Sequence, residues 1–159
     1  MTYEIPLLVS AVVFAAFLAF KFRPAVGHEG RVNAAALVEA KKRLEAAKDD
    51  AARAVALGDA AEASANLGRV DGATAYFLRA FRADPASVEI VERAAKALAR
   101  RPNALEKLMW RHLGLGPGEG ASRRAATLAT LKVLSQVYGR KPRTRVRQQA
   151  VEHLLSLLS

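Results

Sequence analysis

The residues that could carry out chemistry in this chain are few and far apart. His28, His112 and His153 stand alone, without the HExxH or similar spacing by which histidines bind a metal ion. The chain has no cysteine, and none of its serines lies in a GxSxG nucleophile elbow. The carboxylates are scattered over helical patterns, often three or four positions from a base, as Glu92 is from Lys96. The sequence therefore predicts no catalytic residue, no metal and no cofactor, and a protein that is not an enzyme.

A glycine-rich segment, Gly114 to Gly120, has the composition of a phosphate-binding loop. No strand pattern precedes it, no Lys-Ser or Lys-Thr pair follows it, and Glu119 would repel a phosphate. We therefore expect residues 114–121 to form a flexible linker.

A basic segment follows further along the chain, where five cations lie close together and Pro142 disfavours a helix. These cations are Arg140, Lys141, Arg143, Arg145 and Arg147. Two interpretations stay open: a solvated surface that only aids solubility, and a contact with an anionic lipid surface or an acidic partner. Binding of nucleic acid is disfavoured, because no aromatic residues alternate with the cations and no base-reading module is recognisable.

The composition of the chain favours helices. Hydrophobic residues make up 52% of the sequence but aromatic residues only 6%, and alanine is abundant, which is typical of closely packed helices. We therefore expect an all-α fold. The net charge of +10 is uneven: residues 121–159 carry eight basic side chains and one acidic side chain, whereas residues 35–98 carry ten of each.

The clearest helical pattern lies in the middle of the chain. Ala73, Phe77 and Ala80 follow one another at i, i+4 and i+7, so they share one face of a helix. Gly68 before them indicates a turn, and Pro85 ends the helix because it has no N–H and restricts the residue before it.

This arrangement resembles one tetratricopeptide repeat, a pair of antiparallel helices in about 34 residues. The first helix matches the family less well: Leu57 replaces its Trp, Ala60 and Ala61 its Leu-Gly pair, and Ser64 its Tyr. The resemblance implies stacked antiparallel helical hairpins over residues 34–113, with a concave surface that holds segments of other proteins. The alternative is an ordinary antiparallel hairpin with small contact residues.

Two sets of residues could line such a surface. The resemblance assigns Glu62 and Asn66 of the first hairpin to it. In the next helix, four polar residues at i, i+3, i+7 and i+11 share one face. They are Glu89, Glu92, Lys96 and Arg100. The set lacks the Lys/Asn clamp by which chaperone-binding members of the family hold a terminal carboxylate.

The N-terminal segment is apolar. Residues 5–20 carry no charge and would span about 24 Å as a helix, and residues 3–22 about 30 Å, the thickness of a bilayer core. We expect a transmembrane anchor at residues 1–23; a buried helix and a cleaved signal peptide are the alternatives. Lys21 and Arg23 after the span predict a single-pass membrane protein with its N-terminus outside and the bulk of the chain in the cytoplasm.

The remaining segments complete the predicted organisation. Residues 24–33 form a linker ending in a helix cap at Asn33, and a long helix runs from Ala34 to about Leu57. Residues 122–159 form a basic C-terminal hairpin. Together these features predict a membrane-anchored adaptor that binds other, membrane-associated proteins, or alternatively an accessory structural subunit of a larger membrane complex.

Overall fold

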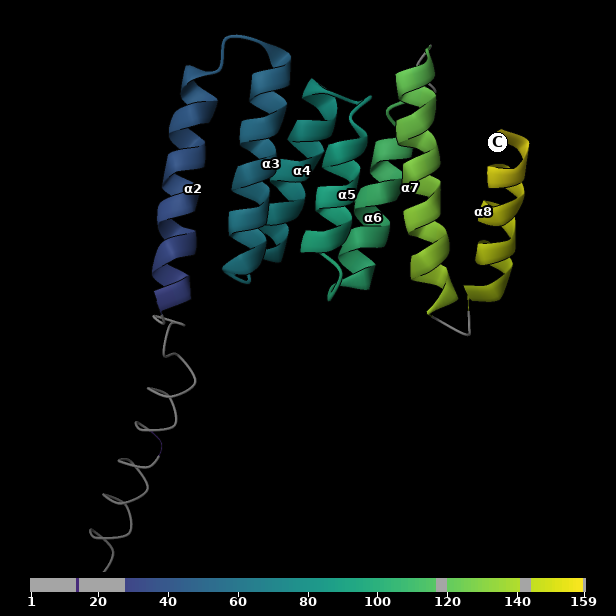
Figure 1. Cartoon of the computed structure of the whole chain (residues 1–159). Helices are drawn as coiled ribbons and strands as arrows, with labels where there is room; N and C mark the ends of the chain where they lie inside the picture. Colours follow the sequence, from purple (N-terminus) through teal and green to yellow (C-terminus); the bar gives the residue numbers. More distant parts are fainter. Residues whose placement is uncertain (1–13, 15–27, 117–119, 141–143, 159) are drawn as a thin grey trace, which may run out of the picture. The chain divides into compact units, whose positions relative to one another are not determined.

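The computed structural model describes Phe14 and residues 28–116, 120–140 and 144–158. Within these residues the fold is all-helical, as predicted, with seven helices and no strand (Figure 1). The helices are α2 (His28–Ala46), α3 (Asp50–Asn66), α4 (Val70–Ala83), α5 (Val88–Ala97), α6 (Pro102–Leu113), α7 (Ala121–Gly139) and α8 (Arg145–Leu158). Contacts divide the chain into residues 1–32 and residues 33–159, and the packing that follows is that of the second unit.

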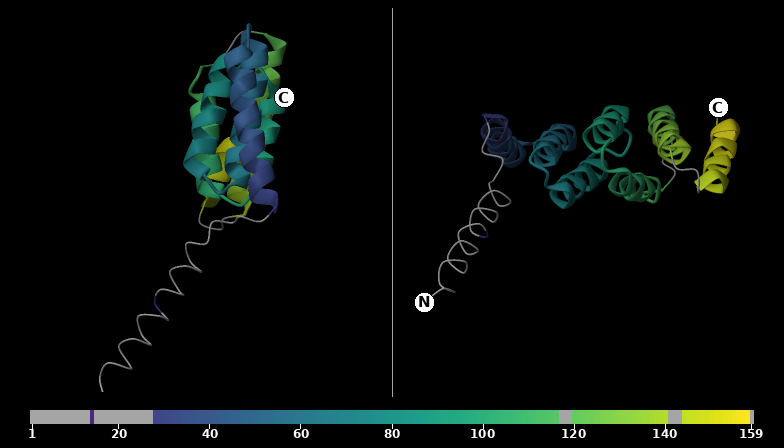
Figure 2. Two further views of the ribbon diagram at one scale, coloured as in Figure 1. Left: turned by 90° about the vertical axis from the view of Figure 1, so that its left-hand side faces the viewer. Right: turned by 90° about the horizontal axis from the view of Figure 1, so that it is seen from below.

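Within the second unit, consecutive helices run antiparallel and pack in two layers. Helix α3 packs on α4 and α5, and α5 packs on α7, so α3, α5 and α7 form one layer (Figure 2). Helices α4 and α6 pack on each other in the second layer, and α8 packs on α7 at the end of the row.

The hairpin of α3 and α4 has the core that the periodicity predicted. Ala73, Phe77 and Ala80 are fully buried. Helix α3 ends in a Schellman motif: Gly68 has φ 75°, its N–H donates to the Ala65 carbonyl (2.9 Å), and the Arg69 N–H donates to the Ser64 carbonyl (2.9 Å). Only glycine adopts this left-handed conformation without strain, which is why the turn falls here.

The segment predicted as one long helix, residues 34–57, is two helices. Helix α2 ends at Ala46, and Asp49 caps α3 by accepting a hydrogen bond from the Ala52 N–H (2.6 Å). This cap satisfies an amide that would otherwise lack a partner in the first turn of α3, so a new helix begins here. Helix α2 begins at His28, so Asn33 lies inside a helix rather than capping one.

The later helices have different kinds of start. Ser87 caps α5 by accepting from the Ile90 N–H (3.3 Å). Helix α6 begins at Pro102, whose missing N–H costs nothing in a first turn. The predicted C-terminal hairpin forms as α7 and α8; in α8 Val151 is buried and Leu154 is exposed.

The predicted localisation needs a correction. No helix of the described residues is long and apolar enough to cross a membrane, and this finding overturns the prediction of a single-pass membrane protein. The longest of these helices, α2 and α7, have 19 residues each and carry charged side chains along their length. The predicted span at residues 5–20 lies outside the described residues except for Phe14.

Candidate functional site

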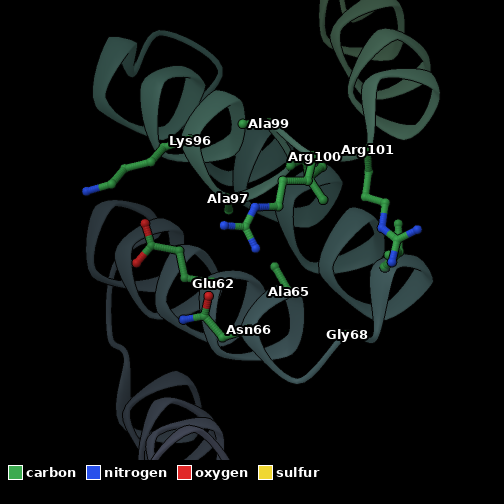
Figure 3. Close-up of a pocket in the computed structure, with 11 residues that line it drawn as sticks. Glu62, Ala65, Asn66, Gly68, Lys96, Ala97, Ala99, Arg100 and Arg101 are labelled. Carbon is green, nitrogen blue, oxygen red and sulfur yellow. The ribbon is translucent and has the colours of Figure 1, made fainter. Parts of the chain in front are cut away.

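The candidate site is a hollow of about 680 Å³ between the C-terminal ends of α3 and α5 (Figure 3). It brings together four of the six residues predicted to bind a partner. Glu62 and Asn66 come from α3, Lys96 comes from α5, and Arg100 comes from the turn after α5. The residues from α3 and those from the end of α5 are about 30 positions apart in the sequence, and the packing of α3 on α5 brings them together.

Small residues keep the hollow open. Ala65, Ala97 and Gly68 line it, so little side-chain volume fills the space between the two helix ends. The Arg100 guanidinium extends over Ala65 toward Asn66, whereas Lys96 points away from Arg100 (Figure 3). The hollow therefore offers hydrogen-bond donors around a floor of small side chains.

The charge of the hollow depends on Arg93, which lies just outside it on α5. Arg93 binds Glu62 through two bonds, Nε to Oε1 (2.9 Å) and Nη2 to Oε2 (3.0 Å). Arg93 also binds Asp59 (2.5 Å), which in turn binds Arg43 of α2 (2.7 Å). The hydrogen bonds that Arg93 donates to Glu62 raise its pKa above the ordinary value; burial opposes this shift, and the bond to Asp59 adds to it. This guanidinium is thus a permanent cation that joins α5 to α3.

Because Glu62 is engaged by Arg93, it does not neutralise the other cations around the hollow. Lys96, Arg100 and Arg101 line the hollow and form no ion pair among the described residues. Lys96 lies in the last turn of α5, where positive charge is favoured by the helix dipole, whereas Arg101 precedes α6. The hollow is therefore a positively charged recess rather than a neutral one.

The other two predicted residues do not join this hollow. The Glu89 Oε1 atom lies 3.9 Å from Arg93 Nη1 and its side chain is 73% exposed, so Glu89 stays at the periphery of the ion pairs. Glu92 lines a different hollow of about 500 Å³ between α5 and α7, together with Leu128 and Lys132. The single face predicted for α5 thus contributes to two separate recesses.

The basic segment before α8 is only partly described. Arg140, Arg145 and Arg147 are exposed, and Lys141 and Arg143 lie outside the described residues. Arg147 donates to Glu106 Oε1 of α6 (3.2 Å). This ion pair links α8 to α6, so Arg147 already has an acidic partner within the protein.

Glu106 belongs to a small polar cluster with two aromatic residues. The Tyr138 hydroxyl donates to Glu106 Oε1 (3.0 Å) and accepts from the Trp110 indole N–H (2.8 Å). Burial raises the pKa of Tyr138, the bond from Trp110 opposes that shift, and the bond to Glu106 reinforces it. Tyr138 is therefore a neutral hydroxyl that orients Trp110.

The sequence analysis missed a buried polar cluster around His112. The Thr130 hydroxyl donates to the Ala126 carbonyl (2.8 Å), so it must accept from His112 Nδ1–H (2.8 Å). His112 Nε2 lies 3.0 Å from both the Pro85 carbonyl and the Arg123 Nη1 atom. The Arg123 contact favours a neutral ring whose Nε2 accepts, whereas the Pro85 carbonyl favours a protonated one. Burial lowers the pKa of His112, the Pro85 carbonyl partly offsets this, and the charge of Arg123 lowers it further.

Arg123 joins three segments of the chain. Its guanidinium donates to the carbonyls of Pro85, Gly116 (2.7 Å) and His112 (3.4 Å). Burial lowers the pKa of this side chain. The spacing of the sequence is the signal that could have predicted the burial of Arg123. Arg123, Thr130 and Leu134 are spaced i, i+7 and i+11, so the two polar residues share the helix face of an apolar one.

The His112 cluster forms a structural joint. It ties the turn after α4 to α6 and α7, and every polar side-chain atom buried in the described residues has a hydrogen-bond partner. No group of three or more metal-binding side chains occurs in the described part of the chain. A comparison with known family models, curated proteins and solved structures finds no match to this chain.

Proposed function

We propose that this protein is an adaptor built from tetratricopeptide-like helical hairpins, which holds a segment of a partner protein in the hollow between α3 and α5. The hairpin of α3 and α4 supports the repeat-like reading. Its predicted contact residues Ala73, Phe77 and Ala80 are buried, and its turn at Gly68 ends α3 as the resemblance implies. Layered packing of α3, α5 and α7 is what stacked hairpins produce.

The observation that carries the proposal is the gathering of predicted residues from two helices around one recess. Asn66, Lys96 and Arg100 supply donors that suit the carbonyl and carboxylate oxygens of a peptide. A volume of about 680 Å³ is within the range of ligand sites in proteins, and it suits a short segment rather than a folded domain. Peptide recognition of this kind needs no catalytic group.

A second candidate is an accessory structural subunit of a larger protein complex. It is favoured by α8, at the end of the row of helices. Val146 and Leu157 of α8 are 79% and 67% exposed, and Leu154 is exposed as well. A subunit that docks permanently through such a face would co-purify in fixed stoichiometry, whereas an adaptor exchanges its partners.

Site-specific photo-crosslinking in cells tests the adaptor proposal. A photoreactive amino acid at Asn66 should give adducts of defined mass, whereas the same probe at Gln149 on α8 should not. Reversing the charge of the hollow with Lys96→Glu and Arg100→Glu should remove the adducts.

The matched control makes the same charge change elsewhere. Lys41→Glu and Lys42→Glu alter two exposed residues of α2 and should leave the adducts in place. If both double variants behave alike, or if Gln149 gives the same adducts as Asn66, the hollow is not the binding site.

A further inference from the structure

A second groove lies in the other layer of the fold, between α4 and α6. Its volume is about 570 Å³. Ala75 and Leu78 of α4 and Ala104 of α6 form its small and apolar part. Basic residues line it from both helices. They are Arg79 and Arg82 of α4, and Lys107 and Arg111 of α6, called here the groove cations.

The groove cations lack carboxylate partners. None of the four forms an ion pair among the described residues. The Arg79 guanidinium lies over the Tyr76 ring, 6.0 Å from its centroid. One carboxylate, Asp71, lies among the residues that line the groove. By contrast, Arg43, Arg93 and Arg147 each bind an acidic side chain.

This arrangement is unfavourable in the isolated protein. Arg79 and Arg82 are spaced i, i+3, and Lys107 and Arg111 are spaced i, i+4, so each pair places like charges side by side on its helix. The two pairs also face the same groove. An anionic ligand would relieve this repulsion. The groove cations therefore favour ligand binding, whereas they do not stabilise the fold.

The groove continues into a hollow of about 470 Å³ that ends on an aromatic ring. This hollow shares Lys107 and Arg111 with the groove and adds Trp110, which is 43% exposed, and Glu106. The Glu106 carboxylate accepts from Arg147 and the Tyr138 hydroxyl. The bond from the Trp110 indole N–H to Tyr138 fixes the ring. An oriented, partly exposed Trp beside cations is a common anchor at protein interfaces.

We infer that α4 and α6 bind an acidic segment of a partner protein, with its carboxylates on the groove cations and an apolar side chain against Trp110. This site shares no lining residue with the α3/α5 hollow, so it is a second binding surface beyond the proposed function.

The lining favours a peptide over a nucleic acid. Single-stranded nucleic acids are held by several aromatic side chains on which successive bases stack. The described lining of the groove and its continuation offers one such ring, Trp110, and a floor of Ala75, Leu78 and Ala104. Alanine and leucine side chains accommodate an apolar side chain of a peptide better than a stacked base.

Trp110 makes the inference directly measurable, because it is the chain's one tryptophan. The full chain is titrated with a short peptide of alternating Glu and Leu, which contains no aromatic residue, and the emission of Trp110 is followed. The expected result is a saturable change in emission that weakens as salt is added, since salt screens the charges. A peptide of alternating Gln and Leu should give no such change.

Variants of the groove cations identify the contact. Changing all four to Gln should weaken binding of the Glu/Leu peptide at least about tenfold, or about 1.4 kcal/mol. The matched control neutralises four exposed lysines elsewhere and should leave the affinity within about twofold. These control changes are Lys41→Gln, Lys42→Gln, Lys48→Gln and Lys132→Gln.

Three results would overturn the inference: no change in Trp110 emission with the Glu/Leu peptide, equal losses in the groove and control variants, or tighter binding of single-stranded oligouridine than of the peptide. Circular dichroism verifies that the groove variant is folded, and removal of like-charge repulsion should leave its melting temperature unchanged or raised. Charge reversal at Lys96 and Arg100 should not affect this titration, so the two proposed sites succeed or fail separately.

Discussion

Arg123→Met should destabilise the protein far more than the same change at the next residue. Arg123 is 5% exposed and donates hydrogen bonds to the carbonyls of Pro85, Gly116 and His112. Methionine retains most of the side-chain volume but removes every donor. The variant therefore removes the Arg123 donor from the Pro85 and Gly116 carbonyls, whereas the His112 carbonyl still accepts from the Leu115 N–H (3.1 Å).

The expected magnitude follows from two opposing effects. Each buried acceptor left without a partner costs about 1–3 kcal/mol. Two of the three carbonyls, those of Pro85 and Gly116, belong to partly buried residues, so water can reach them and the cost lies in the lower half of this range. Removal of a guanidinium that is costly to bury offsets part of the loss. We therefore expect a net loss of about 2 kcal/mol.

The assay is urea unfolding of the full chain, followed by circular dichroism and by Trp110 fluorescence, with coincident transitions required before a free energy is derived. Arg124→Met is the control, because Arg124 is exposed and donates to the Leu158 carbonyl (3.0 Å). It should cost less than about 0.5 kcal/mol. If the two variants lose the same free energy of unfolding, Arg123 does not hold the joint together and the reasoning fails.

Three further results are expected in the same unfolding assay. Phe77→Ala should cost about 3–5 kcal/mol because the ring is fully buried, and a shift below about 1 kcal/mol would contradict that packing. Because the pKa of His112 is lowered in the folded state, the unfolded chain binds a proton before the folded one does as the pH falls. The free energy of unfolding should therefore be constant above about pH 6.5 and decrease below it. His112→Asn should remove that decrease. Gly58→Ala should not give the gain of about 1 kcal/mol typical of a helix, because the new Cβ would lie 3.0 Å from Arg93 Nη1, whereas Gly72→Ala, with 3.9 Å of space, should gain stability.

Local patterns made the α3/α4 hairpin predictable from the sequence. Ala73, Phe77 and Ala80 needed only the helical period, and Gly68 and Pro85 act through their own backbone restrictions. The break at Asp49 was not predictable in this way. The segment around it contains neither glycine nor proline and keeps a helical composition, so the capping bond to Ala52 became evident only in the structure.

Only part of the candidate site was accessible from the sequence. The helical period placed Lys96 and Arg100 on one face of a predicted helix, but it could not tell which helix would lie opposite, nor that α5 ends at Ala97. The bonds between Arg93 and Glu62 join residues 31 positions apart, and they decide that Glu62 is neutralised while Lys96 is not. His112 was interpreted as isolated for the same reason, since Arg123 reaches it only after α6 and α7 pack.

Tertiary pairing supplies what charge counting along the sequence leaves out. The carboxylates Asp59 and Glu62 are bound by Arg43 and Arg93, which join α2, α3 and α5. In the basic C-terminal segment, Arg147 is paired with Glu106. The segment of residues 35–98 is neutral in sum, yet two of its cations, Arg79 and Arg82, form no ion pair among the described residues and line the α4/α6 groove.

The two candidate binding surfaces lie in different layers of the fold. The α3/α5 hollow and the α4/α6 groove share no lining residue, so one segment bound in each would not compete for the same side chains. Both surfaces are built on the same α3/α4 hairpin, whose buried Phe77 fixes the two helices together. Under the two proposals, this hairpin would hold one partner segment between α3 and α5 and a second between α4 and α6, at a spacing fixed by the packing of α3 on α4.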